Sequence, residues 1–296
     1  MTTPLALYCK SYSTDLRRLV RLAESVRKFN VEGLPFYVSV PLAELSLFRE
    51  HLLHVNVELI ADESILAASP RINPYQVARM PGNVSQQIVK SEFWRLGLSE
   101  AYVCLDSDAV FIRPFGRSEF ISDDGTPYTM LDEAHDLLED ALRHGRERVL
   151  TAFKREANQV QQLFGRVGRR YSFGPFPLVW HRAVWLSLDE YYLQPRNMNF
   201  ADAIALAPIE SRWYGEALLA YQAVPLRPCQ ALFKVYHYAW QFDEDRKKNS
   251  LKNAIEQIYC GVIMQSSWER HLDWPEEHGN YLSRMNRRIK RLFGRL

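Results

Sequence analysis

Residues 102–111 read YVCLDSDAVF, an apolar run that ends in two aspartates two positions apart and resumes behind them. Strands that are covered on both faces read as short continuous apolar runs, so the first four residues predict a buried strand. Asp106 and Asp108 then lie at its carboxyl end, where open α/β sheets bind ligands. Hard divalent cations prefer oxygen ligands. The stretch therefore predicts a site for a metal ion and a diphosphate, with a solvated turn as the alternative.

The chain before this stretch alternates between strand and helix patterns. Apolar runs predict strands at 5–9, 36–40 and 55–60, and helical spacing of apolar residues predicts helices at 16–29 and 42–53. This alternation indicates a parallel sheet with right-handed crossovers. The first strand is not followed by G-x-G-x-x-G, and the sequence has no G-x-x-x-x-G-K-[ST] loop, so the usual dinucleotide and NTPase fingerprints are absent.

A long connection and a helix are expected between the third strand and the aspartates. Residues 61–83 contain three prolines and little periodicity, which is typical of a lid or a binding loop. A helix is predicted over 84–96, with Gly97 as its C-cap. One face of that helix is polar and is either solvated or part of a site; it carries Gln86, Gln87 and Lys90.

The chain after the aspartates predicts further elements and two candidate side chains. The elements are peripheral helices over 131–164, a strand entered at 174–180, a polar loop that enters a helix within 208–221, a strand over 231–238 and a helix over 249–264. Glu216 is expected near the start of its helix, where the helix dipole would keep a carboxylate ionised, with ordinary capping as the alternative. His237 is expected near the end of its strand, as a core residue or as a ligand.

Composition places the chain among ordinary globular proteins. It has 296 residues, of which 47% are hydrophobic and 24% charged, enough for a sizeable core. No apolar stretch approaches the length of a membrane-spanning helix, and the first residues do not read as a secretory signal. The four cysteines are widely spaced without a C-x-x-C pair, which favours buried thiols in a reducing compartment and predicts a cytosolic protein.

The formal charge of +2 conceals a basic C-terminus. Residues 284–296 carry six basic side chains and no acid, so the remainder of the chain has a charge of 2 − 6 = −4. This argues against a nucleic-acid-binding body. The apolar residues of the same segment fall on one helical face, which is the pattern of an amphipathic helix on an anionic membrane surface, with a solvated terminal helix as the alternative.

Taken in order, these features resemble the nucleotide-sugar-dependent glycosyltransferases of the GT-A type. The segments that carry the resemblance are the loop 8–15, the polar helix face 86–90, the LDSD motif 105–108, the Gly-Pro entry 174–175 and the segment 210–216. The ESRWYG sequence at 210–215 resembles more narrowly a poorly characterised bacterial group. The implied fold is α/β: a GT-A type, Rossmann-like mixed sheet flanked by helices, in one large domain.

The resemblance also implies a division of the chain. The expected parts are a nucleotide-sugar-binding half over 1–118, a peripheral helical insertion over 119–172, an acceptor-binding half over 173–248, and C-terminal helices with a basic amphipathic tail over 249–296.

The resemblance implies a role for each candidate residue. Asp108 would bind Mn²⁺ or Mg²⁺ directly, Asp106 would contact the ribose or the metal's water shell, and His237 would be a late metal ligand. Lys90 would approach the diphosphate. Glu216 would act as general base, with Glu210 as its rival. The other expected nucleotide contacts are Tyr8, Lys10, Ser11, Asp15, Gln87 and Ser107.

The implied function is metal-dependent transfer of a sugar from a nucleotide-diphosphate donor, with a UDP-sugar expected, to a glycan or lipid-linked acceptor in bacterial surface polysaccharide synthesis. A carboxylate opposite the diphosphate gives inversion; without one, the retaining course is favoured. The expected place is the cytoplasm, peripherally at the inner membrane face. One alternative is a sugar nucleotidyltransferase, but residues 10–15 lack the glycine that a triphosphate-gripping loop needs. The other is a non-catalytic nucleotide-sugar-binding scaffold.

Overall fold

The computed structural model describes residues 2–247 and 254–265. Its strands are β1 (Thr3–Lys10), β2 (Phe36–Val40), β3 (Glu58–Ala61), β4 (Ser99–Leu105), β5 (Ala109–Phe111), β6 (Tyr128–Met130), β7 (Leu178–His181), β8 (Arg227–Cys229), β9 (Phe233–Tyr236) and β10 (Gly261–Met264). Its α-helices are α1 (Leu16–Phe29), α2 (Leu45–His51), α3 (Asp62–Ala67), α4 (Pro74–Ala78), α5 (Gly82–Glu92), α6 (His135–Arg143), α7 (Glu147–Leu163), α8 (Arg182–Leu188), α9 (Phe200–Leu206), α10 (Glu210–Tyr221), α11 (Ala239–Lys247) and α12 (Glu256–Ile258).

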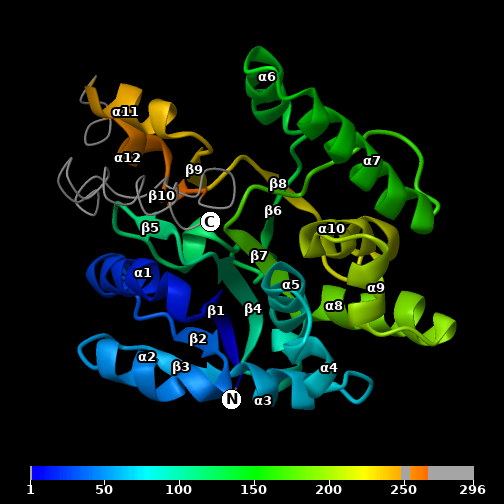
Figure 1. The fold of residues 1–296 in the computed structure, drawn as a ribbon, viewed down its shortest axis with the longest axis horizontal. Helices are drawn as coiled ribbons and strands as arrows, with labels where there is room; N and C mark the ends of the chain where they lie inside the picture. Colours follow the sequence, from blue (N-terminus) through cyan, green and yellow to red (C-terminus); the bar gives the residue numbers. More distant parts are fainter. Residues whose placement is uncertain (1, 248–253, 266–296) are drawn as a thin grey trace, which may run out of the picture.

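The main sheet has five strands in the order β3-β2-β1-β4-β7, with helices on both faces (Figure 1). The first four strands are parallel, and β7 runs antiparallel to β4. The expected mixed sheet flanked by helices is therefore confirmed. Because the parallel strands share one direction, their carboxyl ends lie along one edge of the sheet, and ligands of open α/β sheets bind at that edge.

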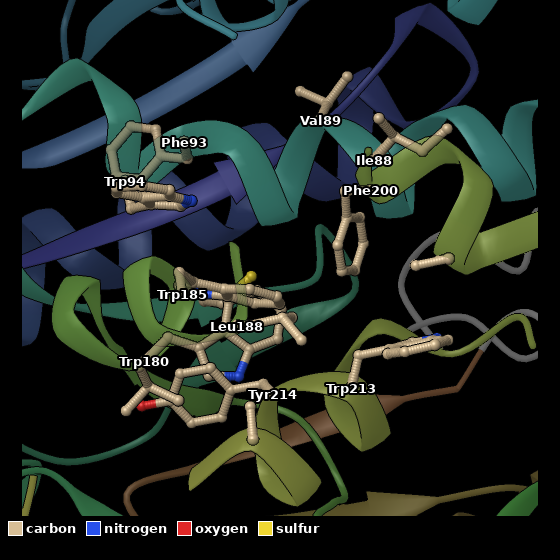
Figure 2. Packing of buried hydrophobic residues seen from close by; sticks show 14 of the residues in the cluster. Ile88, Val89, Phe93, Trp94, Trp180, Trp185, Leu188, Phe200, Trp213 and Tyr214 are labelled. Atoms are coloured by element: carbon tan, nitrogen blue, oxygen red, sulfur yellow. The ribbon is translucent and has the colours of Figure 1, made fainter. Parts of the chain in front are cut away.

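The strands of this sheet read as continuous apolar runs because both of their faces are covered. Successive side chains of a strand point to opposite faces. In β1, Leu5 and Leu7 pack in a cluster with α1 and α2, whereas Tyr8 packs in the cluster on the other face. That second cluster is rich in aromatic rings (Figure 2), including the fully buried Trp180 and Trp213. Packing on both faces holds the sheet in place, and with it the edge where the candidate site lies.

A second sheet continues the chain beyond the two aspartates. It has the order β5-β10-β9, with β10 antiparallel to β5 and parallel to β9. The helix expected over 249–264 is therefore wrong at its C-terminal part, because 261–264 form strand β10, whose four residues are all buried. Part of that segment, and the basic tail at 284–296, lie outside the described residues.

Three other expectations differ from the structure. The connection over 61–83 is not structureless, since it contains α3 and α4. The third strand begins at Glu58 and not at 55. Helix α10 begins at Glu210, so Glu216 lies in the middle of the helix and not near its start. Other predictions hold: Gly97 is the C-cap of the helical segment that ends at Leu96, with a φ of 64°, as a left-handed cap requires.

Gly215 of α10 lies against the ring of Phe173, and a Cβ atom at this position would meet that ring at 2.1 Å. We expect Gly215→Ala to lower the free energy of unfolding by about 1–3 kcal/mol, the usual cost of overpacking a core. The measurement is denaturant unfolding. The matched control is Gly82→Ala in α5, where nothing lies within 4 Å of the added carbon. Equal stability of the two variants would contradict this packing.

No helix in the ranges that the structure describes is both long enough and apolar enough to cross a membrane.

Candidate active site

The two aspartates lie at the carboxyl edge of the main sheet, in the short turn between β4 and β5. The turn is closed by the amide of Ala109, which donates to the carbonyl oxygen of Asp106 at 3.1 Å. Asp108 and Ser107 are buried, at 7% and 8% exposure, whereas about a quarter of the Asp106 side chain (26%) remains exposed. The turn therefore presents one accessible and one buried carboxylate at the edge where ligands bind.

Lys90 of α5 joins Asp106 to a carboxylate from a distant part of the chain. Its ammonium nitrogen Nζ lies 2.6 Å from Oδ1 of Asp106 and 3.5 Å from Oε1 of Glu210, the first residue of α10. The Phe176 ring packs over the same nitrogen, 4.4 Å from the ring centroid. Sequence reasoning named Lys90, Asp106 and Glu210 separately, and the structure brings them together.

Burial and charge act against each other in this cluster. Burial acts to lower the pKa of Lys90, but the charges of Asp106 and Glu210 outweigh it and raise the pKa above the ordinary lysine value. Burial raises the pKa of Glu210, and the nearby Lys90 offsets part of that rise. Lys90 is therefore a firmly charged ammonium, and Glu210 is a carboxylate whose proton affinity is increased. Perturbed carboxyl and ammonium groups of this kind gather at functional sites.

Gln87, also on α5, fixes the place where α10 begins. Its Oε1 accepts a hydrogen bond of 2.7 Å from the amide of Ile209, the residue before the helix. Ile209 has a φ of 113°, which is an outlier for a β-branched residue. Backbone strain of this kind costs about 1–3 kcal/mol and clusters at functional sites. Because α10 begins at this point, Glu210 lies at the positive end of the helix dipole and beside Lys90.

Glu216 occupies a different environment. Both of its carboxylate oxygens accept hydrogen bonds from the guanidinium of Arg166, at 2.6 and 2.7 Å, and the residue is 2% exposed. Bidentate pairs of this kind are among the strong charge-assisted interactions in proteins. The pair attaches the 165–170 segment to α10.

The expected nucleotide loop after β1 contains one buried ion pair. Lys10 Nζ lies 2.8 Å from Oδ2 of Asp62, which directly follows β3. Ser11 is almost fully buried beside it, at 1% exposure. Tyr8 stacks on the ring of Phe93 in the core, with the two centroids 3.8 Å apart. Asp15 pairs with Arg18 at 2.8 Å, at the start of α1.

Asp62 is a candidate that sequence reasoning missed, although a signal was present. Like Asp106, it is an acidic residue directly after a strand of the parallel sheet. Its carboxyl is mostly buried, and burial raises its pKa, which Lys10 counters.

His237 follows β9 and lies across the second sheet from Asp108. The central strand β10 connects them: Met264 donates its amide to the carbonyl oxygen of Asp108 at 3.2 Å, and Gln265 donates to Tyr236 at 2.9 Å. Burial lowers the pKa of His237 to about 4, so its imidazole is neutral near pH 7, the form in which histidine binds metals.

The donor set fits a cation that is shared with a diphosphate. Among the residues with described positions, no group of three or more His, Cys, Asp or Glu side chains is arranged to hold a metal ion. A small divalent cation is commonly held by one or two carboxylates, with phosphate oxygens and water as its other ligands. The aspartates 106 and 108 supply such carboxylates at the ligand-binding edge.

Comparison with solved structures finds proteins of similar architecture. An active-site mutant of LgtC is 13% identical, with 92% of each chain covered and a TM-score of 0.52. Galactosyltransferase LgtC in complex with donor and acceptor sugar analogs is 12% identical, with 87% of this chain and 86% of that chain covered and a TM-score of 0.46. Apo mouse xyloside xylosyltransferase 1 is 8% identical, covering 92% and 99%, with a TM-score of 0.46. The first of these likenesses confirms the GT-A type fold.

Sequence comparisons add a family. No curated protein matches the chain. The model of a family of unknown function, DUF6492, matches residues 2–183, more than half of the chain and a range that includes Lys90, Asp106 and Asp108. The chain therefore belongs to the DUF6492 family.

Proposed function

We propose that this protein is a glycosyltransferase that moves a sugar from a nucleotide-diphosphate donor to a saccharide acceptor. The observation that carries the proposal is the cluster of Lys90, Asp106 and Glu210 at the carboxyl edge of β4. It supplies a cation for a phosphate group and a carboxylate with raised proton affinity, which are the two charges that sugar transfer needs. The GT-A type fold supports the same proposal, because LgtC, a solved neighbour with this fold, is a galactosyltransferase.

We propose that Asp106 and Asp108 hold Mn²⁺ or Mg²⁺, with His237 approaching across β10. When bound, the cation stabilises the negative charge that develops on the leaving diphosphate. Asp106 has a partly exposed carboxylate for this purpose, which also pairs with Lys90. Lys90, whose ammonium lies 2.6 Å from Asp106, would supply a point charge for the diphosphate.

The remaining roles follow from position. Glu210 takes the proton of the attacking acceptor hydroxyl, since its raised pKa makes it a better base than an exposed glutamate. This assigns an inverting course. Glu216 holds Arg166 and thereby positions α10. The nucleoside lies against the ends of β1 and β3, where it meets Lys10, Ser11 and Asp62. Its charged neighbours are Lys10 and Asp62, which pair with each other.

The division of the chain and its place in the cell are proposed from the sequence. We propose that 1–118 bind the donor, that 173–248 bind the acceptor, that the helical part 119–172 lies at the periphery, and that 249–296 carry the C-terminal helices. The basic segment 284–296 would hold the enzyme at the inner membrane face during surface polysaccharide synthesis. That segment lies outside the described residues.

The test of this function is thermal unfolding with UDP, GDP, CDP and the corresponding nucleoside triphosphates, each with and without Mn²⁺. A ligand at a hundred times its Kd stabilises the folded state by about 2.7 kcal/mol, which gives a clear shift in Tm. We expect a metal-dependent shift with UDP and none with Mn²⁺ alone. A shift with nucleoside triphosphates only would indicate a nucleotidyltransferase, and no shift with any nucleotide would contradict the proposed function.

Glu210 and Glu216 make different predictions for pH. A general base works only when deprotonated, so the rate falls as the pH drops below the pKa of Glu210, which burial raises above the usual 4.5. We expect Glu210→Gln to lower kcat by about two to four orders of magnitude. The same change at Glu216 is expected to reduce stability more than kcat, because it breaks the pair with Arg166. The measurements are pH–rate profiles and unfolding curves; the reverse pattern would make Glu216 the base.

A further inference from the structure

A pocket of about 440 Å³ lies beside the proposed active site. Helix α6, from the part of the chain between the two halves, forms one wall with Asp136 and Asp140. Strand β9 and helix α11 form the opposite wall. The volume lies in the usual range for small-molecule sites. The pocket is therefore large enough for a saccharide unit.

The pocket and the cluster around Lys90 share neighbouring parts of the chain. His237 and the pair Gly174–Pro175 line the pocket. The next residue, Phe176, packs its ring over Lys90. Phe233 also lines the pocket and packs against Phe111 of β5, the strand that follows Asp108, with ring centroids 5.0 Å apart. A ligand in the pocket would thus contact His237 and lie near the segment whose Phe176 packs over Lys90.

Contacts between α6 and α11 hold the walls of the pocket together. Gln241 donates a hydrogen bond of 2.6 Å to Oδ2 of Asp140. Just beyond α6, the ring of His144 stacks on Trp240, with centroids 5.2 Å apart. The guanidinium of Arg146 lies 4.5 Å from the ring centroid of Tyr238. These three contacts join the insertion to the C-terminal half, so the insertion helps to shape the pocket.

The lining combines aromatic rings with an excess of carboxylates. Trp240 is 44% exposed and lines the pocket together with Tyr259. The flat face of an aromatic ring packs against the apolar face of a sugar and attracts cations. Carboxylates accept hydrogen bonds from hydroxyl and ammonium groups. Among the residues that the structure describes, the lining contains one lysine, Lys234, and five acids: Asp132, Asp136, Asp140, Glu244 and Asp245.

We propose that this pocket binds the acceptor, and that it selects a saccharide bearing a protonated amine over an anionic saccharide. Carboxylates lining a concave surface concentrate cations and repel anions. The inference rests on the proposed function, because it identifies the class of acceptor for the same site.

The test is saturation-transfer difference NMR on the full chain, with glucosamine, glucose and glucuronate as probes, in a buffer where the amine is protonated. We expect glucosamine to bind about fivefold more tightly than glucose, as one partly exposed charge pair allows, and glucuronate to bind most weakly. Asp136→Asn is expected to reduce the preference for glucosamine, and Trp240→Ala to weaken glucosamine and glucose alike. Asp123→Asn, at an exposed site outside the pocket lining, is the matched control.

The outcomes separate the two proposals. Equal binding of glucosamine and glucuronate, binding that Trp240→Ala leaves unchanged, or no binding of any probe would overturn the acceptor assignment. If the wild type nevertheless shows the metal-dependent shift with a nucleoside diphosphate, the transferase proposal stands and only the pocket assignment fails. If the saccharide preferences appear without any nucleotide shift, the pocket assignment stands and the proposed reaction fails.

Discussion

Replacing Asp108 with alanine is expected to lower turnover by about two to three orders of magnitude, which is the usual cost of losing one preorganised charge-stabilising group. Asp108 is buried at the carboxyl edge of the sheet, and its backbone is fixed by the pairing of β5 with β10. Loss of its carboxylate therefore removes a proposed cation ligand that is buried and fixed in position by the second sheet. The measurement is release of nucleoside diphosphate from the donor whose diphosphate stabilises the wild type.

The matched control for this variant is Asp123→Ala, which removes an exposed carboxylate away from the edge of the sheet. Thermal unfolding of both variants establishes that they are folded. The Asp108 variant is also expected to lose the Mn²⁺ dependence of nucleotide stabilisation, which a purely structural role would leave intact. Turnover close to wild type, with the Mn²⁺ dependence retained, would rule out Asp108 as a cation ligand.

The first four strands and the helices α1, α2 and α5 could be predicted because their signals are local. The helix Leu16–Phe29 and the strand 36–40 were predicted from their apolar patterns, and the structure has both with the same boundaries. Strand β10 could not be predicted in this way, because four apolar residues read equally well as helix. Gly261–Met264 form a strand because they pair with β9 and with β5, and β5 lies far away in the chain.

The residue types of the candidate site could be predicted from the sequence, but their arrangement could not. The motif at Asp106 and Asp108 and the polar face of α5 were visible in the sequence. The choice between Glu210 and Glu216 was not, because it depends on where α10 starts. A tertiary contact sets that start: Gln87 accepts from Ile209, which has a positive φ. Asp62 was missed because the predicted third strand ended too early and left it inside a presumed loop.

Lys90 gives the largest expected effect on stability. Replacing it with methionine keeps an apolar chain of similar length but leaves Asp106 and the buried Glu210 without its ammonium. Breaking a buried ion pair by removing one partner typically costs about 3–5 kcal/mol, because the remaining charge is uncompensated. We expect a loss of this size in the free energy of unfolding near neutral pH, measured by denaturant titration. Lys154→Met, at an exposed position of α7, is the matched control and should change stability little.

The pH dependence of the same variant identifies the cause. Without Lys90, the pKa of Glu210 loses the largest influence that opposes the rise caused by burial. A carboxyl with a raised pKa in the folded state contributes stability below its unfolded pKa and loses it as the pH rises through the folded pKa. The deficit of Lys90→Met should therefore shrink as the pH falls toward 4.5, and Glu210→Gln in the same chain should recover much of it at neutral pH. If the loss of stability changes neither with pH nor with Glu210→Gln, Lys90 acts through packing against Phe176 and not through its charge.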